Sequence, residues 1–226
     1  MNYKIPESCQ VKELNNIYLK CFGYKSDGVF VDVGAYDGIT YSNTWGLADA
    51  GWSGICYEPL FFNQCRENHI GHNVIIVPSC VGNYEGYAEI AVAGAVSTIN
   101  EGYLNSEYWK GDYQNAQKIS VPIIMLDESL LDNGIKPFFD VLSLDVEGGE
   151  TDALLGFDLY YWQPKMAIVE VQELHPAKEL TLQAHFINEY FKNCGYEKIY
   201  CDEINNIYVR RDIYDGRFSI SNSNGI

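Results

Sequence analysis

The fold of this chain is decided by residues 28–38, which read GVFVDVGAYDG. The unbroken apolar, β-branched run at 29–33 is typical of a parallel strand that is buried on both faces. The glycine-rich residues 34–38 indicate a tight turn, and we expect a helix to follow it and to run to the stop signal at Gly51. The backbone N–H groups at the start of such a helix would face a ligand carboxylate, while Asp32 at the strand end suits an ammonium or sulfonium group.

The spacing of the glycines in this turn bears on the nucleotide that the fold would bind. A dinucleotide fingerprint needs the pattern Gly-x-Gly-x-x-Gly. Here Ala35 and Tyr36 follow Gly34, so the first glycine pair is absent. The turn therefore argues against a nicotinamide-dependent oxidoreductase, which stays an alternative. Taken alone, it also fits an ordinary connection between a strand and a helix.

Strands and helices alternate along the rest of the chain. Apolar periodicity predicts a helix within 7–22 and another from Pro176 to Gly195. Further strands are predicted from short apolar runs at 54–57, 74–77, 138–145 and 165–171, followed by a hairpin at 196–210. The order of strand, helix and strand predicts an α/β fold with a parallel sheet and right-handed crossovers.

The length of 226 residues fits a single domain, 1–226. We expect its first part, 1–27, to be an N-terminal helical segment and the tail from 219 to 226 to fray. Residues 87–92 and 119–126 read as strands. Between them, residues 93–118 are rich in Gly, Asn, Ser and Tyr, and we expect an inserted loop or lid there.

An acidic residue ends the second predicted strand. Glu58 lies about 20 residues beyond the glycine turn, where an acidic side chain can bridge both hydroxyls of a ribose. Dehydrogenases use the same placement, so Glu58 predicts an adenosine ribose and not a particular reaction. A solvated loop acid before Pro59 is the alternative, which the preceding glycine turn makes weaker.

More acids follow the predicted strand at 138–145, in the sequence DVEGGE at 145–150. Ligands of open α/β sheets bind beyond the carboxyl ends of the strands. Asp145 and Glu147 point the same way while the chain stays extended, so one could contact a cofactor while the other acts as a base. Glu147 or Glu150 could instead cap the following helix.

Glu170, Glu173 and His175 follow the predicted strand at 165–171. A histidine beside carboxylates is a candidate proton acceptor, because its pKa is readily tuned near neutrality. With Asp145 these residues could also bind a divalent metal ion through oxygen and imidazole ligands. A surface loop with a histidine before a proline is the third interpretation.

The composition argues against several classes of partner. Fifteen Lys and Arg residues stand against 31 Asp and Glu residues, giving a formal net charge of −16. A field of that sign repels phosphate backbones and anionic lipids, so we expect neither nucleic acid nor a membrane as a partner. The seven cysteines have no CxxC or CxxH spacing, which gives no indication of a zinc site. Because we find no apolar leader and no apolar stretch long enough to span a membrane, we expect a reduced, cytoplasmic protein.

In combination these motifs resemble the FkbM family of methyltransferases. Besides 28–38, the matching stretches are SNT at 42–44, GWSGICYEP at 51–59, LDVEGGE at 144–150, LLG at 154–156 and residues 164–170. The resemblance covers residues 10–211 but is weak within 83–137. It therefore leaves the acceptor unidentified.

The resemblance implies a Rossmann-like, seven-stranded, mostly parallel sheet with an antiparallel last strand and helices on both faces. It also implies O-methyl transfer from S-adenosylmethionine, often to sugar hydroxyls. It places the methionine part of the cofactor against Asp32, Gly34, Ala35 and Gly38, with Asn43 nearby. It assigns the ribose to Glu58 and the border of the adenine to Cys80 and Val81.

The candidates for the base that takes the acceptor proton are, in order, Asp145, His175, Glu170 and Glu147. Asp145 is also a candidate contact of the cofactor. We expect the acceptor to be a hydroxyl of a small or glycan-type molecule, and the need for a divalent metal stays open. Besides the oxidoreductase, a binding module that kept the cofactor pocket without catalysis is the remaining alternative.

Overall fold

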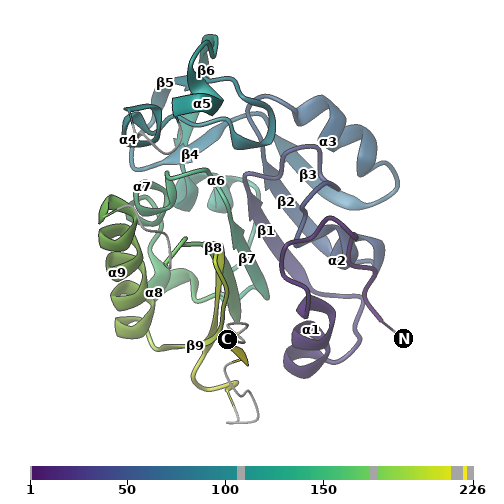
Figure 1. The fold of residues 1–226 in the computed structure, drawn as a ribbon. Helices are drawn as coiled ribbons and strands as arrows, with labels where there is room; N and C mark the ends of the chain where they lie inside the picture. The colour runs from purple at the N-terminus through teal and green to yellow at the C-terminus, as the bar shows by residue number, and fades with distance from the viewer. Residues whose placement is uncertain (1, 106–109, 174–177, 215–220, 223–226) are drawn as a thin grey trace.

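The computed structural model describes residues 2–105, 110–173, 178–214 and 221–222. Its main sheet has eight strands in the order β11-β9-β10-β8-β7-β1-β2-β3 (Figure 1). The strands are β1 (Val29–Val33), β2 (Ser53–Tyr57), β3 (Asn73–Val77), β7 (Val141–Leu144), β8 (Met166–Glu170), β9 (Tyr196–Cys201), β10 (Asn205–Arg210) and β11 (Ser221–Asn222).

Only β10 runs against its neighbours in this sheet, as far as the described residues show. It is antiparallel to β8 and β9, whereas the other pairings are parallel. This confirms the predicted seven-stranded, mostly parallel sheet with an antiparallel last strand. The two-residue β11 adds an edge strand within the tail that we expected to fray, so that expectation is wrong at Ser221 and Asn222, which pair with β9.

Helices cover both faces of the main sheet (Figure 1). They are α1 (Leu14–Phe22), α2 (Trp45–Asp49), α3 (Phe62–Asn68), α6 (Leu126–Asp132), α7 (Glu150–Leu155), α8 (Leu159–Trp162) and α9 (Lys178–Asn193). Side chains alternate across β1, so Phe30 packs into one core with α1 and α2, while Val31 and Val33 pack into the other with α6 to α9. Burial on both faces explains why this strand reads as an unbroken apolar run.

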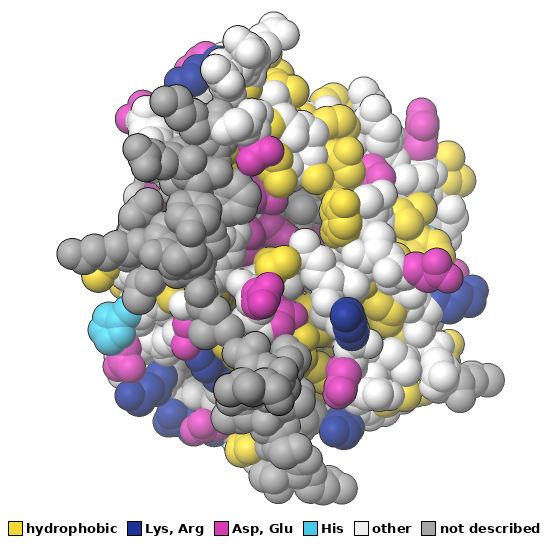
Figure 2. Space-filling model, in the orientation of Figure 1, with side chains coloured by type: hydrophobic (Ala, Val, Ile, Leu, Met, Phe, Trp, Pro, Cys, Tyr) yellow, Lys and Arg dark blue, Asp and Glu magenta, His cyan; other side chains and the backbone are white. Residues whose placement is uncertain are grey.

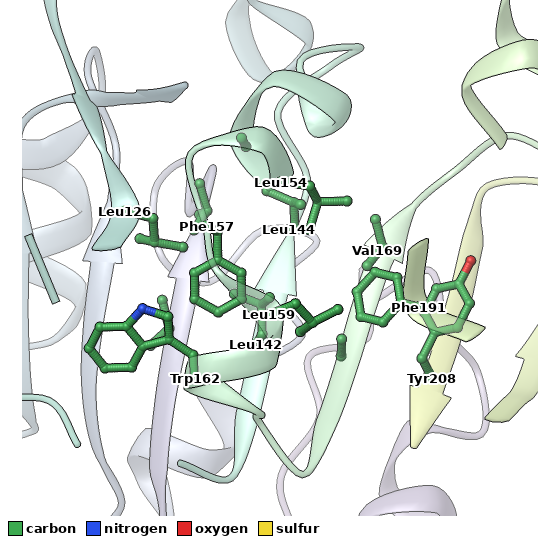
Figure 3. Close-up of a cluster of buried hydrophobic side chains, with 14 of the residues drawn as sticks. Leu126, Leu142, Leu144, Leu154, Phe157, Leu159, Trp162, Val169, Phe191 and Tyr208 are labelled. Atoms are coloured by element: carbon green, nitrogen blue, oxygen red, sulfur yellow. The ribbon is translucent and has the colours of Figure 1, made fainter. Parts of the chain in front are cut away.

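Aromatic side chains hold the long helix α9 against the sheet. Phe191 stacks on Tyr208 of β10, with ring centroids 4.2 Å apart and an angle of 6° between the planes (Figure 3). It also meets Tyr196 edge to face at 5.3 Å. Ring packing by Phe191 therefore holds α9 against β9 and β10.

One helix differs from the prediction in its start. The helix expected directly after the glycine turn begins only at Trp45, because the preceding residues form turns and bends. The N-terminal helix, predicted within 7–22, occupies Leu14–Phe22. Within the described residues no helix combines the length and the apolar character that a membrane crossing requires.

A second, three-stranded sheet lies beyond the carboxyl ends of the main sheet (Figure 1). It contains β4 (Cys80–Gly82), β6 (Lys118–Met125) and β5 (Gly86–Ala91) in that order. The sequence predicted β5 and β6 but neither the short β4 nor their assembly into a sheet. Between β5 and β6, where we expect an inserted loop or lid, the chain forms η1 (Gly94–Val96), α4 (Glu101–Asn105) and α5 (Lys110–Tyr113).

Candidate active site

The register of the main sheet brings four acidic side chains to one face at its carboxyl edge. Asp32 of β1 lies beside Cys56 of β2 and Ser143 of β7, so these three side chains share a face. Glu58 lies two positions beyond Cys56 in the chain, and Asp145 lies two positions beyond Ser143. Glu170 follows two residues after Ile168, which lies beside Ser143. Because side chains alternate along a strand, Asp32, Glu58, Asp145 and Glu170 come to the same side.

The turn after β1 requires glycine at its first position. Gly34 has a φ of +89°, and a Cβ atom there would lie 1.7 Å from the backbone oxygen of Asp145. The turn is fixed by the N–H groups of Gly34 and Ala35, which both donate to the backbone oxygen of Tyr57. The helix was expected directly after this turn, but α2 begins later, and these two amides of the turn are bonded internally and do not face a ligand.

Asp32 is a buried carboxylate held by hydroxyl groups. It is 4% exposed, and its Oδ2 accepts a hydrogen bond of 2.5 Å from the Thr44 hydroxyl. Burial raises the pKa of Asp32 to about 6, against the opposing hydrogen bonds from Thr44 and Ser143. Asn43 lies beside it and donates from Nδ2 to the Ser143 hydroxyl at 3.3 Å. Its low exposure makes Asp32 a strong attractor for a cationic group.

Glu58 is held in place by backbone amides. Its Oε1 accepts from the N–H groups of Leu60 and Phe61 at 2.7 and 2.9 Å, and its Oε2 from the N–H of Tyr36 at 3.0 Å. A carboxylate has about four acceptor sites, so Oε2 keeps one for a ligand hydroxyl. Burial raises the pKa of Glu58, although these three hydrogen bonds oppose the rise.

A cleft with two adjoining parts joins Asp32 to Glu58. Glu58, Cys80 and Val81 line one part, and Asp32, Ala35 and Asn43 line the other. Their shared wall is formed by Gly34, Tyr36, Ala95, Asp145 and Glu147. Of the predicted cofactor residues, Gly38 lies outside this lining and packs instead against His69.

Acidic side chains gather at the centre of this face in a hollow bordered by hydrophobic ones (Figure 2). Carboxylate oxygens of Asp145, Glu147 and Glu170 all lie within 4.8 Å of one another. Burial and the negative charge of Glu170 raise the pKa of Asp145, while burial and Asp145 raise that of Glu147 to about 9. Burial and the charge of Glu147 raise the pKa of Glu170 as well. Asp145 and Glu147 line the cleft, and Glu170 lies behind them.

The remaining acids of the sequence motifs have structural contacts. Glu150 is 3% exposed, and its Oε1 accepts from the N–H groups of Val146 and Gly148 at 3.0 and 3.2 Å, as expected of an acid at a helix start. Glu173, which we expected beside Glu170 and Asp145, instead pairs with Lys198 at 2.6 Å. Although burial opposes it, this contact lowers the pKa of Glu173. His175 lies outside the described residues.

Several residues in or next to the cleft carried no signal that the sequence analysis used. Ala95 and Val96 come from the region of weak resemblance and line the part of the cleft that contains Asp32. Gln172 donates from its amide nitrogen to Glu170 Oε1. Ser143 could have been found, because it lies two residues before Asp145 on the same strand and therefore faces the same side.

Comparison with known proteins gives a family match. A family model described as the methyltransferase FkbM domain matches residues 32–198. None of the curated proteins matches the chain. Among solved structures, the chain is similar to precorrin-6y C5,15-methyltransferase from Geobacter metallireducens GS-15, with 12% identity, a TM-score of 0.46 and coverage of 91% of this chain and 93% of that chain. It is also similar to a protein from Staphylococcus aureus provisionally assigned as a caffeoyl-CoA O-methyltransferase, with 10% identity, a TM-score of 0.44 and coverage of 81% and 76%.

Proposed function

The chain belongs to the FkbM methyltransferase family and is an S-adenosylmethionine-dependent methyltransferase, and we propose that it methylates a hydroxyl oxygen of a small or glycan-type acceptor. The family match confirms the resemblance found in the sequence. It also takes away the case for a nicotinamide-dependent oxidoreductase. The oxygen as methylated atom and the class of acceptor rest on the argument that follows.

The residues of the cleft fit S-adenosylmethionine. The contact between Gly34 and the backbone of Asp145 leaves no room for a side chain, so the turn forms a closely fitted floor. Asp32 on one part of the cleft suits the ammonium group of the methionine end, and Glu58 on the adjoining part suits a ribose hydroxyl. In this proposal Ala35 and Asn43 border the methionine end, and Cys80 and Val81 border the adenine.

The observation that carries the hydroxyl acceptor is the pair of carboxylates, Asp145 and Glu147, on the wall shared by both parts of the cleft. Bound S-adenosylmethionine supplies a methyl group on a positively charged sulfur. As the bond from the methyl carbon to the acceptor oxygen forms and the bond to sulfur breaks, the hydroxyl proton must leave. In its ionised form Asp145 or Glu147 is a strong base, because its pKa is raised, and a base that takes this proton contributes about 10²–10⁴-fold in rate.

The same acids disfavour anionic acceptors. Asp32, Asp145 and Glu147 all line the cleft, so a phosphate or carboxylate group placed there would be repelled at short distance by the ionised form of these acids. A neutral hydroxyl meets no such repulsion and needs a base, which the site provides. Uncharged sugars and glycosides therefore fit the site better than sugar phosphates.

The proposal is tested by methyl transfer from labelled S-adenosylmethionine to a panel of neutral glycosides, sugar phosphates and carboxylic acids. We expect a product with neutral glycosides whose methyl group survives mild base, as an ether does and an ester does not. Asp145→Asn should lose most of the turnover, while Glu128→Gln, which changes an exposed acid on α6, should keep it. Calorimetric binding of S-adenosylhomocysteine without transfer to any acceptor would favour the non-catalytic binding module instead.

A further inference from the structure

We infer that Asp145, Glu147 and Glu170 bind one divalent cation, which in turn holds the acceptor oxygen in the cleft. This inference rests on the proposed function for the identity of the acceptor, but the cation site itself rests on geometry. The three residues come from the end of β7, the turn that follows it and the end of β8. One oxygen from each lies within 4.8 Å of the others, as required of ligands that share an ion.

One member of this cluster, Glu170, has a buried oxygen without a hydrogen-bond partner among the described residues. Glu170 is 5% exposed, and the oxygen is its Oε2. Its other oxygen accepts from the Gln172 amide, which orients the carboxylate. A buried acceptor left unsatisfied destabilises the folded protein, whereas a cation would satisfy it. Ligating groups oriented by such a second contact are common at metal sites.

The charges around the cluster are negative. The groups that shift the pKa of Asp145 and Glu147 are, besides burial, other acids: Glu170, Glu150, Asp32 and Asp112. Glu150 fixes the turn through Oε1, which accepts from the amides of Val146 and Gly148, and it is not among the three residues whose oxygens converge. No lysine or arginine is among these groups within the described part of the chain. A divalent cation compensates this charge at the point where the acids converge.

The donor set selects the kind of ion. Three carboxylates and no sulfur or imidazole favour Mg²⁺, Mn²⁺ or Ca²⁺ over Zn²⁺. Such ions take six or more oxygen ligands, and Asp145 and Glu147 face the cleft. Positions therefore stay open toward the cleft for the acceptor hydroxyl and water. A hydroxyl bound to a cation gives up its proton more readily, so with the cation bound the transfer depends less on a strongly basic carboxylate.

The test uses Mn²⁺ as the probe on the whole protein, with titrations followed by electron paramagnetic resonance and by calorimetry, with and without S-adenosylhomocysteine. We expect one bound Mn²⁺ per chain, displaced by Mg²⁺ or Ca²⁺. Glu147→Gln removes a ligand at the partly exposed turn and should weaken Mn²⁺ binding about tenfold or more. Glu128→Gln is the matched control and should bind as the wild type does.

Two outcomes overturn the inference. The first is wild-type protein that binds S-adenosylhomocysteine but no Mn²⁺, which leaves the proposed function intact and shows that protons fill the cluster. The second is Mn²⁺ binding that Glu147→Gln leaves unchanged, which places the ion elsewhere. Mn²⁺ binding that depends on Glu147, in a protein that transfers no methyl group to any hydroxyl, would support the cation site and refute the proposed acceptor. Circular dichroism of Glu147→Gln shows that a lost site is not lost folding.

Discussion

Replacing Gly34 by alanine separates the two reasons for a glycine in the turn after β1. Gly34 has a φ of +89°, which is unfavourable for other residues, and its Cβ would lie 1.7 Å from the backbone oxygen of Asp145. Gly71 has the same φ of +89°, yet a Cβ there would meet nothing within 4 Å. Gly71→Ala is therefore the matched control, because it carries the backbone cost without the steric clash.

The size of the effect follows from these contacts. The left-handed backbone costs either variant about 1–2 kcal/mol. An ordinary contact between carbon and oxygen is about 3.3 Å, so relief of a contact of 1.7 Å at Gly34 moves the Asp145 backbone by about 1.6 Å. Such overpacking adds about 1–3 kcal/mol. Because Asp145 lines both parts of the cleft, a displacement of this size should lower turnover about 10²-fold.

Two measurements check this reasoning. Urea unfolding should place Gly34→Ala about 1–3 kcal/mol below Gly71→Ala in stability. Calorimetry should show weaker binding of S-adenosylhomocysteine only for Gly34→Ala. The reasoning is refuted if both variants lose the same stability and bind S-adenosylhomocysteine as the wild type does. The close approach of the Asp145 backbone to the turn would then contribute nothing to stability or binding.

Two further substitutions test the charge and the packing of the same fold. Burial raises the pKa of Asp32 from 3.8 to about 6, so the folded protein without ligand loses about 3 kcal/mol as pH rises through that range. Asp32→Asn should remove this loss, so at pH values above 7 its Tm should exceed that of the wild type. The same substitution should weaken S-adenosylhomocysteine binding by about 1.5–3 kcal/mol. Scanning calorimetry from pH 5 to 8, with matched binding titrations, checks both signs. Phe191→Ala removes a fully buried ring stacked on Tyr208 and should cost about 3–5 kcal/mol in urea unfolding, with S-adenosylhomocysteine affinity unchanged because Phe191 lies outside the cleft lining.

The sequence predicted the main sheet well because its strands are buried on both faces. A short apolar run such as VFVDV at 29–33 strongly favours a buried strand, and the glycine turn fixes where the strand ends. The short strand β4 was missed, since Cys80–Gly82 is three residues long and shows no periodicity. The helix start after the turn was misplaced because the Asp37 carboxylate accepts from the N–H groups of Ile39 and Thr40, and this local bonding competes with a helix.

The sequence predicted those residues of the candidate site that lie at the ends of strands. Asp32, Glu58, Asp145 and Glu170 each follow or end a predicted strand, so their meeting at one edge follows from topology. Glu173 was misplaced because the reading used nearness in sequence, whereas the Lys198 ammonium, 25 positions away, holds it on another surface. Contacts between a strand and a helix elsewhere in the chain likewise cannot be predicted from the spacing of residues in the sequence. Cys56 lies in β2, yet its sulfur comes within 4.8 Å of ligand atoms on Cys65 of α3 and on His69, which directly follows α3.

The placement of the acids has a thermodynamic consequence for the whole protein. Asp32, Asp145, Glu147 and Glu170 converge at one edge, where burial raises the pKa of each. A raised acid pKa means that the ionised group is less favourable in the folded protein than in the unfolded chain, so the site without ligand weakens the fold above that pKa. A ligand that carries positive charge into the cleft reverses this cost. Binding to the folded state adds about 2.7 kcal/mol at a ligand concentration of 100 Kd. Because the sulfur of S-adenosylhomocysteine is uncharged, this ligand should stabilise the fold less than S-adenosylmethionine at equal concentration.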